Sequence, residues 1–136
     1  MGLEGRAVHH SRDRVLRVEA VPGQTRKQPF HVRLKGGEAF GFAGLWTPGA
    51  TPNATPTCAI ITTTANEILA PIHGRMPVIL DPDDEALWLD PGPIAPIKVL
   101  ACLRPFPSER MEAIRVSSLV SSPSNDGPQL IEPVLA

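Results

Sequence analysis

The sequence is poor in aromatic residues, in cysteine and in long apolar stretches. Aromatic residues make up 4% of the 136 residues and tyrosine is absent, so we expect a core built mainly from Ala, Val, Ile and Leu. No stretch approaches the roughly 18 apolar residues of a membrane-spanning helix. The first residues, MGLEGRAVHHSRDR, contain no apolar signal core. We therefore expect neither membrane insertion nor export, and a protein of the cytoplasm.

The two cysteines, Cys58 and Cys102, are far apart and form no Cys-x-x-Cys pair. Such spacing gives little support to a disulfide or a zinc site. We expect both residues to be buried, reduced thiols. We expect no metal ion and no other cofactor.

Charge is balanced overall but unevenly distributed. The formal net charge is -1, so no overall positive field attracts nucleic acid, and any such binding needs a local basic patch. Basic residues gather in the first quarter of the chain: Arg12, Arg14, Arg17, Arg26, Lys27, Arg33 and Lys35. Acidic residues gather at 81–90. Two solvated faces of opposite charge explain this asymmetry as well as a binding surface does.

The 16 prolines and 11 glycines predict short strands and many irregular connections. Period-2 alternation and β-branched runs predict strands, of which 57–65 is expected to be buried. The predicted strands are 15–21, 29–34, 39–46, 57–65, 76–80 and 111–120. The predicted helices are short, at 66–73, 81–90 and 94–103. We therefore predict a single domain of the α+β class, with a curved, partly closed, mainly antiparallel β-sheet and short helices.

A glycine pair suggests how two of these strands connect. Gly36 and Gly37 supply the positive φ angles of a two-residue turn, so strands 29–34 and 39–46 are expected to form a hairpin. His31 is expected to be solvated on one strand face. Trp46 and Trp88 are expected to anchor the core, although Trp46 could instead stack on a base. His9 and His10 are expected in a disordered arm rather than in a metal site.

His73 draws attention because it stands between a short helical turn and a strand. Side chains at such junctions often lie in clefts, and an imidazole can transfer protons near neutral pH. Arg75 follows two residues later and could bind an anion such as a phosphate. Thr62 and its two threonine neighbours end the preceding strand. From the chemistry alone, a packed or surface histidine remains the alternative.

The sequence motifs around His73 are more informative than the single histidine. The stretch AIITTTANEILAPIHGRMPVIL, at 59–80, closely resembles the signature of the SRAP family, the SOS response-associated peptidases. RKQPFHVRL, GFAGLW, ALWLDP and SSPSNDGPQLIEPV resemble further family motifs in the family's order. The resemblance covers about 24–134. Several motifs in the right order are far more specific than any one alone.

The resemblance implies a function at damaged DNA. SRAP proteins recognise abasic sites in single-stranded DNA and take part in the DNA damage response. Their N-terminal cysteine attacks the ring-opened sugar through its α-amine, and its thiol then closes a thiazolidine ring. A glutamate and a histidine handle protons. The peptidase name reflects the self-processing that frees the amine, so the family combines hydrolase chemistry with DNA–protein crosslinking.

The family's residues are carried over position by position. His73 matches the family histidine as a general acid/base, Thr62 matches a threonine that lines the DNA groove, and Arg75 supports the site or a phosphate. Lys27 belongs to the Lys-Gln-Pro motif and is expected to form, with Arg26, Arg33 and Arg75, a basic groove that binds single-stranded DNA. Glu19 falls at the spacing of the family glutamate but lacks its aromatic neighbours, so an ordinary exposed strand residue is the alternative.

The start of the chain departs from the family. Met1 is followed by glycine, not cysteine, so residues 1–19 are expected to be a divergent segment and 20–136 a partial SRAP domain. The codons of Leu16-Arg17-Val18 can read Tyr-Glu-Trp in another frame, and we hypothesise that residues up to about Glu19 are out of frame. We expect this chain to lack the crosslinking activity.

Three functional hypotheses are compared. The first is an abasic-site processing protein that acts as a monomer on single-stranded DNA and is nucleoid-associated when bound. The second is a truncated, non-catalytic remnant that binds single-stranded DNA weakly. A conventional serine or cysteine protease is disfavoured, since there is no Gly-x-Ser-x-Gly motif and neither cysteine stands in a reactive motif.

Overall fold

The computed structural model describes residues 5–11, 14–17, 28–49, 51, 53–93 and 95–135. The chain divides into two compact units, each assembled from three separate stretches. The first unit combines the N-terminal stretch up to Ser11 with Phe40–Thr64 and Arg75–Phe106. The second combines Arg12–Ala39, Ala65–Gly74 and Pro107–Ala136. Among the described residues, no helix is long and apolar enough to cross a membrane.

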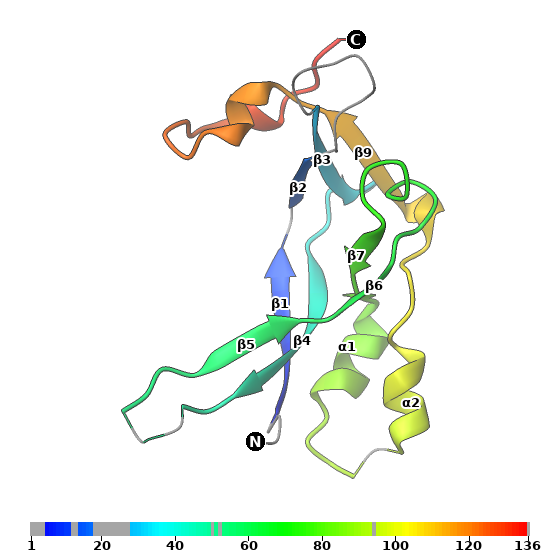
Figure 1. Ribbon diagram of the computed structural model, residues 1–136. Helices are drawn as coiled ribbons and strands as arrows, with labels where there is room; N and C mark the ends of the chain where they lie inside the picture. The colour runs from blue at the N-terminus through cyan, green and yellow to red at the C-terminus, as the bar shows by residue number, and fades with distance from the viewer. Residues whose placement is uncertain are drawn as a thin grey trace. The chain divides into compact units, whose positions relative to one another are not determined.

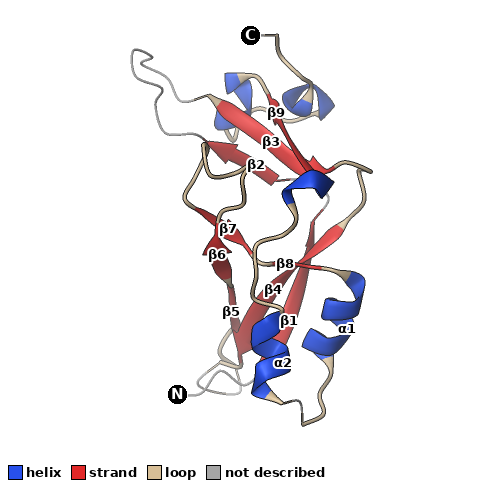
Figure 2. Cartoon of the chain, turned by 90° about the vertical axis from the view of Figure 1, so that its right-hand side faces the viewer, coloured by secondary structure: helices blue, strands red, loops and turns tan. Residues whose placement is uncertain are grey.

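The first unit is built on an antiparallel sheet in which β4 pairs with three other strands (Figure 1). These strands are β1 (Gly5–Ser11), β4 (Phe40–Thr47), β5 (Thr57–Ile60) and β8 (Ile79–Leu80). A separate two-stranded sheet joins β6 (Thr62–Thr64) and β7 (Arg75–Pro77). The helices α1 (Pro82–Leu89) and α2 (Pro96–Ala101) lie side by side in both views (Figures 1 and 2).

The core of the first unit forms where α1 and α2 pack on the sheet. Its buried side chains are Ala43, Val78, Leu80, Trp88 and Cys102. The indole N–H of Trp88 donates a hydrogen bond of 3.2 Å to the carbonyl oxygen of Gly44, which satisfies the one polar group that this side chain buries. Trp88 is thus the core anchor that the sequence predicts.

The local sequence explains the start of α1. Pro82 occupies the first helical turn, where its missing N–H costs no hydrogen bond. Asp83, Asp84 and Glu85 fill that turn, next to the positive end of the helix dipole. Asp84 also pairs with Arg104 at 2.6 Å.

The second unit is a three-stranded antiparallel sheet with 3₁₀ turns around it. Its strands, in spatial order, are β2 (Arg14–Arg17), β3 (Pro29–Leu34) and β9 (Met111–Arg115). The 3₁₀ helices are η1 (Ser108–Arg110), η2 (Ser118–Ser121) and η3 (Pro128–Ile131). The α+β class with antiparallel sheets and short helices is confirmed.

The predicted hairpin between 29–34 and 39–46 is wrong. β3 pairs with β2 and β9, whereas β4 pairs with β1, β5 and β8. A turn does form, since the N–H of Gly37 bonds to the carbonyl of Leu34 at 2.9 Å. Of the glycine pair, Gly37 alone has a positive φ, of 68°. A type I′ hairpin turn needs a positive φ at both of its central residues. The chain instead passes from the sheet that contains β3 into the sheet that contains β4.

Several burial predictions also fail. His31 is fully buried because β3 is the central strand of its sheet. Trp46 is 39% exposed, because it lies near the end of β4, opposite the exposed Cys58 of the outer strand β5. All four residues of β5 are exposed, so the predicted buried strand at 57–65 is wrong, and so is the predicted burial of Cys58. Cys102 is buried as predicted.

Three further expectations need correction. His9 and His10 lie in β1, where backbone pairing with β4 orders the chain whatever its side chains are. The helix expected at 94–103 is reduced to α2, and its Ile97 is exposed. The few aromatic residues are concentrated in the core rather than excluded from it: Phe40, Phe42, Trp88 and Phe106 are buried.

Candidate functional site

Thr62 and Arg75 are held together by two hydrogen bonds. The strands β6 and β7 run antiparallel, with Thr64 opposite Arg75 and Thr62 opposite Pro77. The Arg75 side chain reaches along this ladder. Its Nε–H donates to Thr62 Oγ1 at 3.0 Å, and its Nη2 donates to the Thr62 carbonyl oxygen at 2.7 Å. Both residues are exposed, so these contacts fix the plane of a solvent-facing guanidinium group.

The ten residues between β6 and β7 form a compact turn in the second unit. The N–H of Ala65 bonds to the Gly74 carbonyl at 3.1 Å and closes the base of the turn. Asn66 begins the turn: its Oδ1 accepts the N–H of Leu69 at 3.1 Å, and its Nδ2 donates to the sulfur of Met111 at 3.3 Å. The Asn66 side chain thus caps the start of the turn. The expected helical turns are present as tight turns rather than as a regular helix.

His73 ends this turn. Its backbone N–H donates to the Leu69 carbonyl at 2.8 Å, and its neighbour Ile72 is buried together with Leu69. The His73 side chain itself is exposed. An anchored backbone with an exposed imidazole suits a group that exchanges a proton with a bound molecule. This excludes the alternative of a packed core histidine.

The structure thus brings Thr62 and Arg75 into contact, while His73 belongs to the second unit. Glu19 and Lys27, the other residues singled out in the sequence, lie outside the described residues. Within the described part of the chain, no group of three or more His, Cys, Asp or Glu side chains is placed to hold a metal ion. The thiol of Cys102 donates hydrogen bonds to Asp84 Oδ1 at 3.7 Å and to the Lys98 carbonyl oxygen at 3.5 Å.

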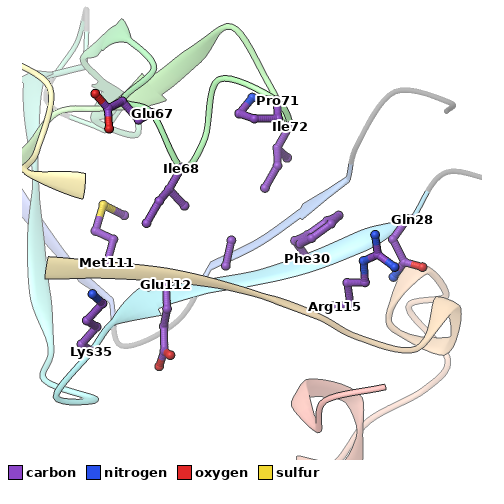
Figure 3. Close-up of a pocket in the computed structure, with 11 residues that line it drawn as sticks. Gln28, Phe30, Lys35, Glu67, Ile68, Pro71, Ile72, Met111, Glu112 and Arg115 are labelled. Atoms are coloured by element: carbon purple, nitrogen blue, oxygen red, sulfur yellow. The ribbon is translucent and has the colours of Figure 1, made fainter. Parts of the chain in front are cut away.

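One feature of the second unit was missed by the sequence reasoning. An open cavity of about 720 Å³ lies between the turn that carries His73 and the sheet of β3 and β9 (Figure 3). Ile68, Pro71 and Ile72 line it from the turn, and Phe30 and Met111 line it from the strands. The alternation of β3 and β9 hinted at one apolar face, but no pattern in the sequence indicated that this face stays open.

The family model of the SOS response associated peptidases (SRAP) matches residues 19–123. The chain belongs to this family. The match includes the Thr62, His73 and Arg75 segment, so the resemblance carried by these motifs is confirmed.

The chain is also similar to curated members of this family. It is 46% identical over 108 residues to the abasic site processing protein YoqW of Bacillus subtilis, a match that spans 78% of this chain and 48% of YoqW. It is 35% identical over 96 residues to the abasic site processing protein HMCES of Gallus gallus, spanning 69% of this chain and 28% of HMCES. The chain therefore spans about half the length, or less, of these SRAP relatives.

Solved structures agree on the fold. A crystal structure of a Bacteroides thetaiotaomicron protein matches with a TM-score of 0.81 and 25% identity, covering 98% of this chain and 58% of that protein. A Bordetella bronchiseptica protein matches with a TM-score of 0.68 and 20% identity, covering 82% of this chain and 55% of that one. The second likeness concerns the fold alone.

Proposed function

We propose that the protein acts at abasic sites in single-stranded DNA. The observation that carries this proposal is the anchored turn that ends in an exposed His73, within the segment that marks the chain as an SRAP protein. The relatives YoqW and HMCES are both named abasic site processing proteins. An aldehyde in a ring-opened sugar is the reactive group of such a site. Protons must move when the sugar ring opens and closes.

In this proposal, each of the residues singled out in the sequence has a separate task. His73 is the general acid/base for opening the sugar ring, because its imidazole is exposed while its backbone is fixed at Leu69. Arg75 contacts a backbone phosphate, and Thr62 is a positioning residue that fixes the guanidinium group. Lys27 adds positive charge that attracts the DNA backbone. Glu19 is the second group that handles protons.

We further propose that a polypeptide of this sequence binds abasic DNA without linking to it permanently. A thiazolidine needs an amine and a thiol on the same residue, since the amine condenses with the aldehyde, water leaves, and the thiol then adds to the imine carbon. Cys58 and Cys102 lie inside the chain, and their nitrogens are amides. A thiol alone adds to an aldehyde reversibly, and such an adduct does not survive denaturation. In this proposal, residues 1–19 are a divergent segment and residues 20–136 are a partial SRAP domain.

The test uses fluorescent single strands that are identical except at one position. One carries an abasic site, one carries its tetrahydrofuran analogue without an aldehyde, and one is intact. Anisotropy gives the Kd for each at two salt concentrations, and a denaturing gel detects covalent products. We expect tighter binding to the abasic strand and no band that survives denaturation. For His73→Ala we expect the preference for the abasic strand to fall by about three- to ten-fold, the loss of one hydrogen bond.

Each other outcome has a definite meaning. Equal affinity for all three strands would contradict the proposed recognition of abasic sites. A band that survives denaturation would refute the non-covalent proposal and point to an amine of this chain, such as that of Gly2 after removal of Met1.

A second candidate function is weak, indiscriminate binding of single-stranded DNA. The exposed Arg75 favours it, whereas Arg33 contributes less because its Nε pairs with Glu112 Oε1 at 2.6 Å. This function predicts that the three strands bind alike and with the same dependence on salt.

A further inference from the structure

The open cavity of the second unit has an apolar interior. Figure 3 shows Ile68 and Ile72 coming from the turn and facing Phe30 and Met111 on the strands. Register pairs Leu34 with Met111 and Val32 with Ala113, so these strands present one continuous apolar face. We call this cavity the Ile68 groove, after the half-buried side chain on its wall.

The groove is preformed. Asn66 bridges its two sides, because its side chain caps the turn at Leu69 and also donates to the Met111 sulfur. Leu69 and Met111 are almost fully buried, at 2% and 1% exposure. The wall therefore cannot collapse onto the floor without breaking these contacts. A preformed apolar groove loses little conformational freedom when it binds a partner.

The lining favours aliphatic and aromatic side chains over a phosphodiester. Four charged residues contribute to the lining, the basic Lys35 and Arg115 and the acidic Glu67 and Glu112, and the two carboxylates point away from the cavity in Figure 3. The Glu112 carboxylate is already engaged by Arg33. A nucleic-acid backbone needs an excess of positive charge, and successive bases need several aromatic platforms. Among the described residues that line the groove, Phe30 supplies the one aromatic ring, next to aliphatic side chains.

The coverage of the matched proteins indicates where such a partner comes from. Nearly all of this chain superimposes on the Bacteroides thetaiotaomicron structure, yet the match leaves a large part of that protein without a counterpart. The same holds for YoqW, of which 48% is matched. The unmatched part of a family member must pack somewhere, and a preformed apolar groove next to matched elements offers a surface to cover.

We propose that the Ile68 groove binds a polypeptide segment with apolar side chains, supplied by the part of SRAP proteins that this chain's match does not span. The segment inserts its side chains between Ile68 and Pro71 on one side and Phe30 and Met111 on the other. Binding is driven by burial of apolar surface.

The experiment uses overlapping fluorescent peptides that tile the unmatched part of YoqW, added to the full 136-residue chain. Anisotropy measures binding to the chain and to three variants. Ile68→Asp places a charge on the groove wall, and Pro71→Asp places one at the rim, where the residue is exposed and an aspartate stays solvated in the free chain. Leu119→Asp is the matched control: Leu119 is an exposed apolar residue on η2, outside the groove lining.

We expect at least one peptide to bind, with a Kd that rises about ten-fold or more in Ile68→Asp and Pro71→Asp because an aspartate in the groove must be desolvated. Leu119→Asp should leave the Kd unchanged within about two-fold. Circular dichroism tests whether each variant is folded. If Ile68→Asp does not fold, Pro71→Asp still tests the groove.

Three outcomes would overturn the proposal. In the first, no peptide binds, or the groove variants bind as well as the control. In the second, the chain self-associates in sedimentation velocity and the groove variants are monomeric, so that the groove is an interface between copies. In the third, the groove variants no longer bind single-stranded DNA and no peptide competes with the DNA for the chain, so that the groove is a nucleic-acid site.

Discussion

Replacing Asn66 by alanine tests the feature on which the His73 turn depends. The Asn66 side chain makes two contacts that alanine cannot make, one to the N–H of Leu69 at 3.1 Å and one to the Met111 sulfur at 3.3 Å. The first caps the turn and the second ties it to β9. The substitution therefore removes a link along the chain and a link across the unit.

The two contacts differ in strength. Loss of an asparagine cap costs about 1 kcal/mol. A thioether is a weak acceptor, so the second contact adds little. We expect Asn66→Ala to lower the free energy of unfolding by about 1 kcal/mol, which corresponds to a fall in Tm of about 4 °C for a chain of this size.

Asn66→Asp separates the two contacts. Aspartate keeps the oxygen that accepts from Leu69 and loses the amide that donates to Met111. We therefore expect Asn66→Asp to retain most of the stability that Asn66→Ala loses. Urea unfolding, followed through the fluorescence of the buried Trp88, measures both, and the m value should stay constant. If the Asp and Ala variants lose equal stability, or if neither loses any, the cap does not hold this turn.

The remaining predictions concern other parts of the chain. Arg75→Ala should lower the salt dependence of single-stranded DNA binding by about 0.7 in the log–log slope, the contribution of one phosphate contact; an unchanged slope would remove Arg75 from the interface. A thiol reagent should modify the exposed Cys58 in the native state and the buried Cys102 only on unfolding, which a reaction time course with and without denaturant checks. Gly37→Ala should lower the free energy of unfolding by about 1 kcal/mol, because φ is 68° at this position. Gly74→Ala should lower it by less, since an added Cβ there meets open space and φ is not positive. Thermal unfolding of both variants checks the difference.

The site segment could be predicted from the sequence because its signals are local. The short helical segment predicted at 66–73, where tight turns form, and the strand predicted at 76–80 both depend on residues close in the chain. The motif order identified the family for the same reason. No local signal predicted the Thr62–Arg75 contact, because it requires β6 and β7 to pair across the turn.

Strand pairing and burial were predicted poorly because they depend on the whole fold. Gly36 and Gly37 fit a hairpin locally, yet β3 finds its partners in β2 and β9. His31 is polar and alternates with apolar residues, which predicts exposure, but the central position of β3 buries it. Composition misled in the same way, since a sequence with few aromatic residues still places four of them in the core.

The proposed groove and the proposed DNA site share one segment, and this has a thermodynamic consequence. Ile72 lines the groove and is bonded to His73, while Met111 forms part of the floor and anchors Asn66 at the start of the same turn. A peptide in the groove therefore contacts the support of His73. If the peptide changes the affinity for an abasic strand by some factor, the strand must change the affinity for the peptide by the same factor. Titrating each ligand in the presence of the other measures both factors. If each ligand raises the affinity for the other, the groove occupant orders the His73 turn. If neither ligand changes the affinity for the other, the contacts of Asn66 already order this turn fully.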